Sequence, residues 1–365
     1  MSSTDLPRIA RLDLSGADVR RARALPCGQV GTSAAHAPAH GGRTALWIEL
    51  LATLGLDPHA LWPLAAALAF EGDQWTAVEP SRDELRALYG VDVQELVVWR
   101  PLAEHAIEHL SAGRALVVDV DAFWLPVAAG SDDTDYRRHH RKTTIVLNEL
   151  DLDARRIACL HASGCLEARG DDVTHLLGLE DDASDLEAIA DWRGARVAQL
   201  GAAAMALEAG RLPPRAQFVR ADRRVARSTE ELQMLALHHL GSHLAFRPES
   251  NPLRQFAARL ADDLPLLREY GPASYADWAS CTVRQLASAF AFAVRGLAWQ
   301  DAPHASPLRD AARSFEHIAR DAQALEARLD DARSTSKPVD TASLLEGMAQ
   351  CWDDGMAALD AACGR

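Results

Sequence analysis

Three segments in the middle of the chain carry the alternating pattern of strands, and they constrain the fold more than any other feature. Apolar and β-branched residues alternate with polar ones in ALVVDVDAFWLP (115–126), KTTIVLNEL (142–150) and RRIACLHA (155–162). Asp151 and Asp153 lie in the short connection between the second and third segments, which predicts a hairpin. We therefore expect a sheet here, covered by helices from elsewhere in the chain.

The remaining segments are predicted to be mainly helical. Before the sheet, apolar helices are expected from Thr44 and over PHALWPLAAALAF, and SRDELRALYG opens with a capping box of Ser81 and Glu84. From about residue 196, long amphipathic segments with short connections predict an antiparallel bundle. The fold class expected is α+β. It has an α+β domain over residues 1–195 and an all-α helical bundle domain over residues 196–365, with RLPPRAQF (211–218) as a linker.

Composition argues against several classes of protein. The 365-residue chain has a formal net charge of −14, which disfavours nucleic acid and anionic membranes as partners. No apolar run approaches the roughly 20 residues that span a bilayer, and the first residues contain no hydrophobic signal segment. The six cysteines form no CxxC pair, so no metal site is predicted. Together these features predict a cytoplasmic protein.

A dense basic cluster lies where a polar loop gives way to the strand that begins at Lys142. Its members are Arg137, Arg138, His139, His140, Arg141 and Lys142. Lys142 is one of only two lysines in the chain, which otherwise uses arginine. Such a cluster could meet a phosphate or an acidic partner protein. Alternatively, it is a solvated loop neutralised by the aspartates at positions 132, 133 and 135.

The order of the elements matches that of a papain-type acyl-transfer fold. A helix starts near residue 42, a strand begins near His140, and a later strand carries His161. In such folds a cysteine at the helix start is activated by the helix dipole and by the histidine. Here Gly42 occupies the helix start, where it can bind an anion but cannot attack a carbonyl. Cys27 is the nearest cysteine in sequence and therefore the candidate nucleophile.

Two pairs of carboxylates could contact a substrate. Glu71 and Asp73 flank a glycine in FEGDQW, where a turn would present them to a cleft, unless Gly72 merely caps a helix. Asp119 and Asp121 lie on the same face of one predicted strand because strand side chains alternate. One of these two aspartates would bind a substrate amine or form an ion pair with Lys142.

The chain resembles an uncharacterised bacterial family defined as a domain of unknown function. The resemblance rests on LWIELLATLGLDP (46–58), FEGDQW (70–75), LYGVDVQEL (88–96), VDAFWLP (120–126), YRRHHRKTTI (136–145), LHASG (160–164) and TVRQ (282–285). The N-terminal half is more distantly similar to the butirosin biosynthesis H-type acyltransferases. That similarity implies a papain-like N-terminal domain and transfer of an aminoacyl group from a carrier-protein thioester to an amine. Members of the closer family are associated with carrier proteins and their loading ligases.

The resemblance also implies roles for individual residues. His140 matches the expected catalytic histidine, Asp121 matches an acidic position on the preceding strand, and His161 matches as well. Lys142 and Thr143, with Thr144, belong to a shared motif of unknown role. Gly42 stands where the family's cysteine is expected, and Ala162 stands where an asparagine is expected.

Three hypotheses follow for the function. In the first, the chain is an acyl- or aminoacyltransferase-like protein that acts on a phosphopantetheine thioester without a cysteine nucleophile. His140 is then the base, Asp121 holds the small-molecule amine acceptor, and the basic cluster contacts the phosphopantetheine phosphate or the acidic carrier protein. No cofactor is expected to be bound. In the second, the chain is a non-catalytic relative that binds a carrier protein or a biosynthetic enzyme. In the third, it is a hydrolase that uses Cys27.

Overall fold

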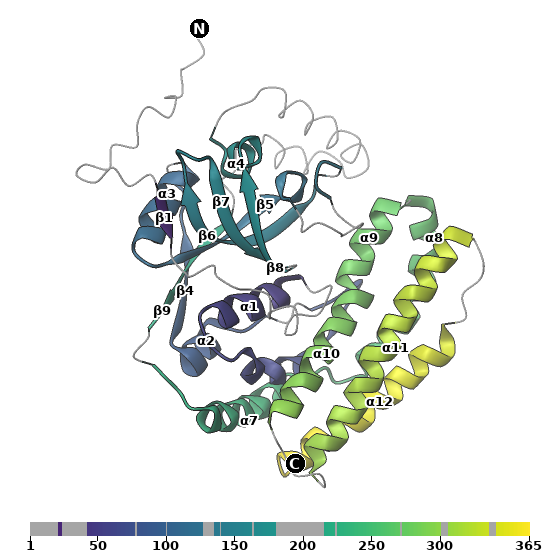
Figure 1. The fold of residues 1–365 in the computed structure, drawn as a ribbon. Helices are drawn as coiled ribbons and strands as arrows, with labels where there is room; N and C mark the ends of the chain where they lie inside the picture. The colour runs from purple at the N-terminus through teal and green to yellow at the C-terminus, as the bar shows by residue number, and fades with distance from the viewer. Residues whose placement is uncertain are drawn as a thin grey trace. The chain divides into compact units, whose positions relative to one another are not determined.

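The computed structural model describes most of the chain as two compact units (Figure 1). The described residues are 21–23, 42–76, 79–99, 101–126, 135–138, 140–162, 164–179, 215–222, 225–270, 272–300, 306–335 and 341–365. Unit 1 comprises Met1–Gln29 and Asp92–Ala221, and unit 2 comprises Val30–Val91 and Asp222–Arg365. The protein is thus α+β, with a sheet-containing region followed by helices. The predicted boundary at residue 195 lies outside the described residues.

Unit 1 is built on a sheet in the order β4-β9-β5-β6-β7-β8, with β1 paired to the far end of β6. The strands are β1 (Arg21–Arg23), β4 (Val91–Leu96), β5 (Ala115–Asp121), β6 (Lys142–Asp151), β7 (Arg156–His161), β8 (Gly164–Arg169) and β9 (Ala216–Ala221). The β6–β7 hairpin is the one predicted from the sequence, and Ala154 N–H donates to the Asp151 carboxylate within its turn (2.9 Å). The predicted strand 115–126 ends at Asp121, where a short 3₁₀ turn, η3 (Ala122–Trp124), begins.

The predicted linker at residues 211–218 is wrong in its last part. Ala216 begins β9, which pairs antiparallel with β5 through Ala115–Val118. Ala216 and Val219 are almost fully buried, so this strand contributes to the core of unit 1. A proline pair, Pro213 and Pro214, comes shortly before it and is typical of a loop, which hides the strand from a pattern search.

One face of the sheet packs against helices to form the core of unit 1. Val118 and Val120 on β5 and Ile145 on β6 join residues of α3 (Leu102–Ser111) and α4 (Asp171–Leu177) in a single apolar cluster. Because side chains alternate along β5, Asp119 and Asp121 lie on the opposite face from this cluster. The sheet therefore separates its apolar core from its carboxylates.

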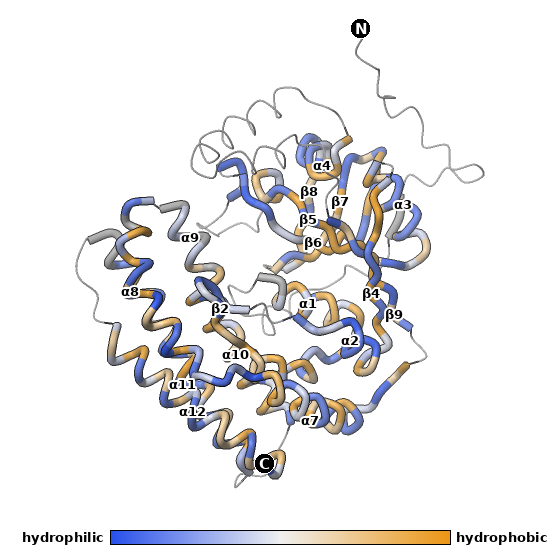
Figure 2. Tube along the Cα trace, turned by 180° about the vertical axis from the view of Figure 1, so that it is seen from behind, coloured by the Kyte–Doolittle hydropathy of each residue, from blue (hydrophilic) through white to orange (hydrophobic). Residues whose placement is uncertain are grey.

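Unit 2 contains the remaining helices and one small hairpin. The helices are α1 (Gly42–Thr53), the 3₁₀ helix η2 (Pro58–Ala67), α2 (Arg82–Tyr89), α7 (Thr229–Ala245), α8 (Pro252–Tyr270), α9 (Pro272–Cys281), α10 (Val283–Trp299), α11 (Pro307–Thr335) and α12 (Ala342–Ala362). Helices α10, α11 and α12 pack successively, and η2 packs against α7 and α10. Figure 2 shows apolar and polar residues alternating along α8, α11 and α12, as amphipathic bundle helices require.

Local sequence signals account for several helix ends in unit 2. The predicted capping box at α2 is present, where Ser81 pairs reciprocally with Glu84, and Ser228 forms a second one with Glu231 at α7. Helices α9 and α10 are separated at Thr282, whose hydroxyl donates to Trp278 O (2.6 Å). Gly72 caps no helix, because it lies in the turn between β2 (Phe70–Glu71) and β3 (Gln74–Trp75).

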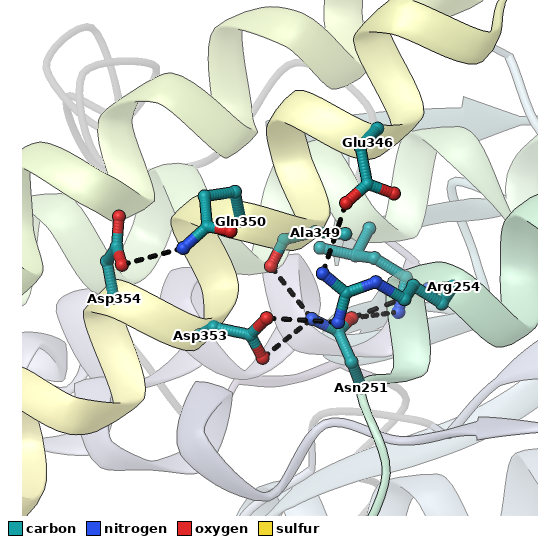
Figure 3. A network of polar contacts seen from close by, with 8 residues as sticks. Asn251, Arg254, Glu346, Ala349, Gln350, Asp353 and Asp354 are labelled. Atoms are coloured by element: carbon teal, nitrogen blue, oxygen red, sulfur yellow. Dashed lines mark hydrogen bonds and ion pairs between the residues drawn. The ribbon is translucent and has the colours of Figure 1, made fainter.

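A polar network joins the start of α8 to α12 within unit 2 (Figure 3). The Asn251 side-chain amide donates to Ala349 O (2.8 Å) and to Asp353 (2.9 Å), while its oxygen accepts from Leu253 N–H. Arg254 bridges Asp353 and Glu346 across the same junction. Asn251 is buried, so its satisfied hydrogen bonds fix the register of the two helices.

Gly296 of α10 lies against η2, and its substitution tests this packing. A Cβ added at Gly296 would lie 2.1 Å from Trp62 Cβ, whereas one added at Gly347, in the middle of exposed α12 surface, meets nothing within 4 Å. We expect Gly296→Ala to lower the free energy of unfolding by about 3 kcal/mol or more. Gly347→Ala should raise it by about 0.5–1 kcal/mol through helix propensity. Urea denaturation followed by tryptophan fluorescence measures both, and equal midpoints for the two variants would contradict this packing.

Candidate functional site

The most informative polar contact in unit 1 joins His140 to Asp121. His140 Nδ1 lies 2.7 Å from Asp121 Oδ2, and both side chains are half-buried, with 18% and 28% of their surface exposed. A carboxylate on Nδ1 holds a neutral imidazole in the tautomer that carries its lone pair on Nε2. The sequence predicted both residues as site residues, and the structure brings them into contact.

The local fold fixes the Asp121 carboxylate before it meets the histidine. Asp121 ends β5 and caps η3, so its Oδ1 accepts hydrogen bonds from Phe123 N–H (3.0 Å) and Arg141 N–H (3.2 Å). Ala122 N–H donates to Arg141 O (2.8 Å), which ties the end of β5 to the chain entering β6. The Phe123 ring stacks on the His140 ring, with centroids 4.2 Å apart and 12° between planes. The imidazole is therefore held by a carboxylate and by an aromatic face.

A second polar group lies beside this pair on the same face of the sheet. Asp121 is directly opposite Lys142 across the β5–β6 ladder, and Asp119 is directly opposite Thr144. Asp119 accepts a hydrogen bond from the Thr144 hydroxyl (2.7 Å) and forms an ion pair with Lys142 Nζ (3.1 Å). The expected aspartate–lysine pair thus exists, and it uses Asp119. Lys142 is 77% exposed, so its ammonium can leave Asp119 at little cost.

Thr143 and His161 form a separate pair on the other face. Thr143 is directly opposite Val120, a member of the apolar core cluster, and its hydroxyl lies 3.0 Å from His161 Nε2. Burial lowers the pKa of His161 to about 4. These two predicted site residues contact each other, but the sheet separates them from Asp121 and Lys142. His161 is therefore placed as a neutral, packed imidazole.

Most cations of the basic cluster already have carboxylate partners. Arg137 pairs with Asp172, and Arg141 pairs with Asp135 (3.1 Å). Arg138 is exposed at the turn, and His139 lies outside the described residues. Asp135 is one of the three aspartates expected to neutralise the loop. This pairing favours a structural role for Arg137 and Arg141 over phosphate binding.

Three of the other predicted site residues belong to unit 2, whereas His140 belongs to unit 1. Glu71 and Asp73 lie at the exposed tip of the β2–β3 hairpin in unit 2, and Gly42 is the first residue of α1 in the same unit. Cys27 lies outside the described residues. Gly42 at the start of α1 belongs to unit 2 and His140 belongs to unit 1. The papain-type arrangement, in which this helix start faces the histidine, therefore stays a prediction.

The described cysteines of unit 1 are too far from His140 to act as its nucleophile. Cys165 is opposite Leu160, which is opposite Val146, and Cys159 is opposite Leu147. Val146 lies four residues beyond Lys142, a distance of roughly 13 Å along β6. Cys165 is displaced from Val146 by two further strands, roughly 10 Å. A direct thiol–imidazole pair is therefore excluded for both cysteines.

Unit 2 contains a second aspartate–histidine pair with the same bond length. His59 Nδ1 lies 2.7 Å from Asp57 Oδ1, and Asp57 caps η2. The His59 ring stacks against Phe292 and Trp299, which belong to α10. Burial would raise the pKa of Asp57, but hydrogen bonds from His59 and Trp299 outweigh it and lower the pKa. This pair serves helix capping and core packing, and it provides an internal comparison for Asp121–His140.

Among the described residues, no group of three or more histidine, cysteine or carboxylate side chains could hold a metal ion. The described helices also include none that is long and apolar enough to cross a membrane.

Comparison with known families identifies both halves of the chain. The DUF1839 N-terminal domain matches residues 42–192, and the DUF1839 C-terminal domain matches residues 229–361. The chain belongs to the DUF1839 family. The N-terminal domain of this family includes the Asp121–His140 pair and Asp172, and the C-terminal domain covers α7 to α12. No curated protein matches the chain.

Sequence reasoning missed several residues around the pair. Phe123 and Asp172 were not singled out, although Phe123 stacks on His140 and Asp172 binds Arg137. The motif VDAFWLP contains Phe123, and its position two residues after an aspartate at a strand end is the available signal. Asp172 is 35 residues from Arg137 in sequence, and no local pattern links the two.

Acidification tests the buried state of His161. Its folded pKa of about 4 lies below the ordinary value of 6.5, so the neutral ring stabilises the fold fully above pH 6.5. That stability is lost as the pH falls from 6.5 toward 4, by about 3 kcal/mol in total. We expect the unfolding free energy of His161→Gln to fall less over this range than that of the wild type. Thr143→Val, which keeps the imidazole, should retain the wild-type slope, and parallel curves for all three proteins would contradict a buried neutral ring.

Proposed function

We propose that this DUF1839 protein catalyses transfer of an acyl or aminoacyl group from a thioester to an amine, with His140 as general base. The observation that carries the proposal is the Asp121–His140 pair, whose ring is fixed by a 2.7 Å bond and by stacking on Phe123. Orientation of a histidine by a buried or half-buried carboxylate is how general bases are set up in acyl transfer. The pair also remains partly accessible, as a base must be.

The reaction needs no nucleophile from the protein. The acceptor amine attacks the thioester carbonyl carbon, and the carbon–sulfur bond breaks when the tetrahedral intermediate collapses. His140 Nε2 accepts the proton from the attacking nitrogen and returns it to the departing sulfur, so the products are an amide and a free thiol. A thioester is already activated, and positioning with one base therefore suffices. This mechanism accommodates the glycine at position 42.

The substrate arm in the proposal is the phosphopantetheine of an acidic carrier protein. The support is the distant resemblance of the N-terminal half to acyltransferases that use such carriers, together with the order of helix 42–53 and strand β6, which matches that of papain-type folds. Lys142 is the cation best placed to contact the arm, because it is 77% exposed and lies directly opposite Asp121. Asp121 is committed to His140 and to two backbone N–H groups, so Asp119 is the better candidate to hold the amine acceptor.

A non-catalytic carrier-binding relative is the second candidate function. It is favoured by the ion pairs that Arg137 and Arg141 already make and by the glycine in place of a nucleophile. The two functions differ in one measurable respect, because a binding protein would bind the carrier without releasing thiol from it. Hydrolysis through Cys27 has no support from the described residues.

An aminoacyl N-acetylcysteamine thioester, which reproduces the end of the phosphopantetheine arm, tests the proposal directly. With primary amines as acceptors, the wild-type protein should release free thiol, measured with a chromogenic thiol reagent. We expect His140→Gln to lower the rate by 10²–10⁴-fold, on the order of a general base's contribution. Asp121→Asn should also lower it, because an amide can donate to Nδ1 and so favour the other tautomer.

The second aspartate–histidine pair provides the matched control. His59→Gln removes an imidazole with the same 2.7 Å carboxylate contact, but in the η2 core of unit 2. It should reduce stability and leave the rate per folded molecule unchanged. Equal rates for wild type and His140→Gln, or no thiol release above the uncatalysed rate with any amine, would refute the transferase proposal. Retained binding of a loaded carrier in that case would favour the second candidate.

A further inference from the structure

Asp172 lies at the centre of a buried contact that holds the segment carrying His140. It sits in the first turn of α4, and only 6% of its surface is exposed. Its Oδ2 accepts from the Tyr136 hydroxyl (2.9 Å), and its Oδ1 accepts from Arg137 Nη2. A buried carboxylate with a charged partner and a hydroxyl is strongly held, because removing either partner would leave a buried charge unsatisfied.

Arg137 is held at three points at once. Its backbone lies in the left-handed region, with φ of 57°, and its N–H donates to Phe123 O (2.9 Å). Its guanidinium lies over the Trp124 ring, 4.2 Å from the centroid. A left-handed arginine costs roughly 1 kcal/mol, so surrounding contacts must maintain it. The ion pair to Asp172 and the contact with Trp124 are the interactions that do so.

Helix α4 supplies a second contact to the same region. His175, one turn after Asp172, stacks on the other partner of Arg137, the Trp124 ring, with centroids 3.6 Å apart. Phe123, the neighbour of Trp124, is the ring that stacks on His140. The two segments that flank the histidine pair, η3 and the turn at residues 136–138, thus both contact α4.

From these contacts we infer that Asp172 is a positioning residue: through Tyr136 and Arg137 it sets the place of His140 on Asp121. Within the motif YRRHH, Tyr136 and Arg137 then anchor the segment to α4, and His140 is the residue that serves as the proposed base. The catalytic consequence rests on the proposed transferase function, whereas the placement of the imidazole does not. Arg137 is then committed to Asp172, with 42% of its side chain exposed, and Lys142 remains the cation available to a substrate.

The tautomer of His140 reports this placement independently of activity. In protein labelled with ¹⁵N-histidine, two-bond correlation spectra at a pH where the imidazoles are neutral distinguish Nδ1–H from Nε2–H forms. The signals lost in His140→Gln identify this residue among the 14 histidines. We expect the wild type to hold the Nδ1–H form, and Asp172→Asn to shift His140 toward a mixture of both forms. The rate of thioester aminolysis should fall with it, on the order of 10–100-fold.

Asp92→Asn is the matched control within unit 1. Asp92 on β4 is a largely buried carboxylate, and it pairs at 2.9 Å with a mostly exposed arginine, Arg220, on β9. The Asp92→Asn variant should lower the melting temperature about as much as Asp172→Asn does. It should leave the His140 signals in their wild-type positions. If Asp172→Asn does not fold, Tyr136→Phe removes one bond to Asp172 and should give a smaller shift toward the mixture.

Two results would overturn the inference. One is an unchanged His140 tautomer in folded Asp172→Asn or in Tyr136→Phe, and the other is an equal change in Asp92→Asn. Absence of thiol release from the wild type would refute the proposed transferase function only, because the tautomer measurement would still decide the role of Asp172.

Discussion

The local structure of the candidate site depends on the hydrogen bonds of one carboxylate, that of Asp121. One oxygen accepts the backbone N–H groups of Phe123 and Arg141, and the other meets His140. The same side chain therefore ends a strand, starts a 3₁₀ turn, holds the entry to the next strand and orients an imidazole. An alanine here would leave the two backbone donors without this acceptor and the ring without its partner, so structure and chemistry are coupled at a single residue.

The strand alternation in the sequence predicted this coupling only in part. It correctly placed Asp119 and Asp121 on one face, because a period of two depends on nothing beyond the backbone. It also indicated the β6–β7 hairpin, whose turn chemistry is local. The alternation did not indicate that Thr143 and His161 would lie on the opposite face from Asp121. That result also needs the pairing of residues between neighbouring strands. The register itself was the missing quantity.

The elements that sequence reasoning missed depend on contacts between distant segments. Strand β9 lies between β4 and β5 in the sheet, although β4 is about 120 residues earlier in the chain. No local sequence pattern can therefore predict which strands β9 pairs with. The break at Thr282 arises from a hydroxyl that bonds the preceding turn, a choice that an apolar helical pattern conceals. Asp172 reads as an ordinary acidic residue in the first turn of a helix, and only the fold brings Tyr136 and Arg137 to it.

Comparison of the two aspartate–histidine pairs shows what distinguishes a candidate base from a capping contact. Both have a 2.7 Å bond, and both aspartates cap a 3₁₀ turn. In the Asp57 pair the histidine follows within two residues, so the contact is a by-product of the cap, and α10 rings pack against it. In the Asp121 pair the histidine lies 19 residues away, on a segment that contains the left-handed Arg137. Helix α4 holds this region through the ion pair of Arg137 with Asp172 and the stack of His175 on Trp124. Chain entropy opposes such a long-range contact, and the number of interactions that maintain it is what singles out His140 as the residue whose position matters.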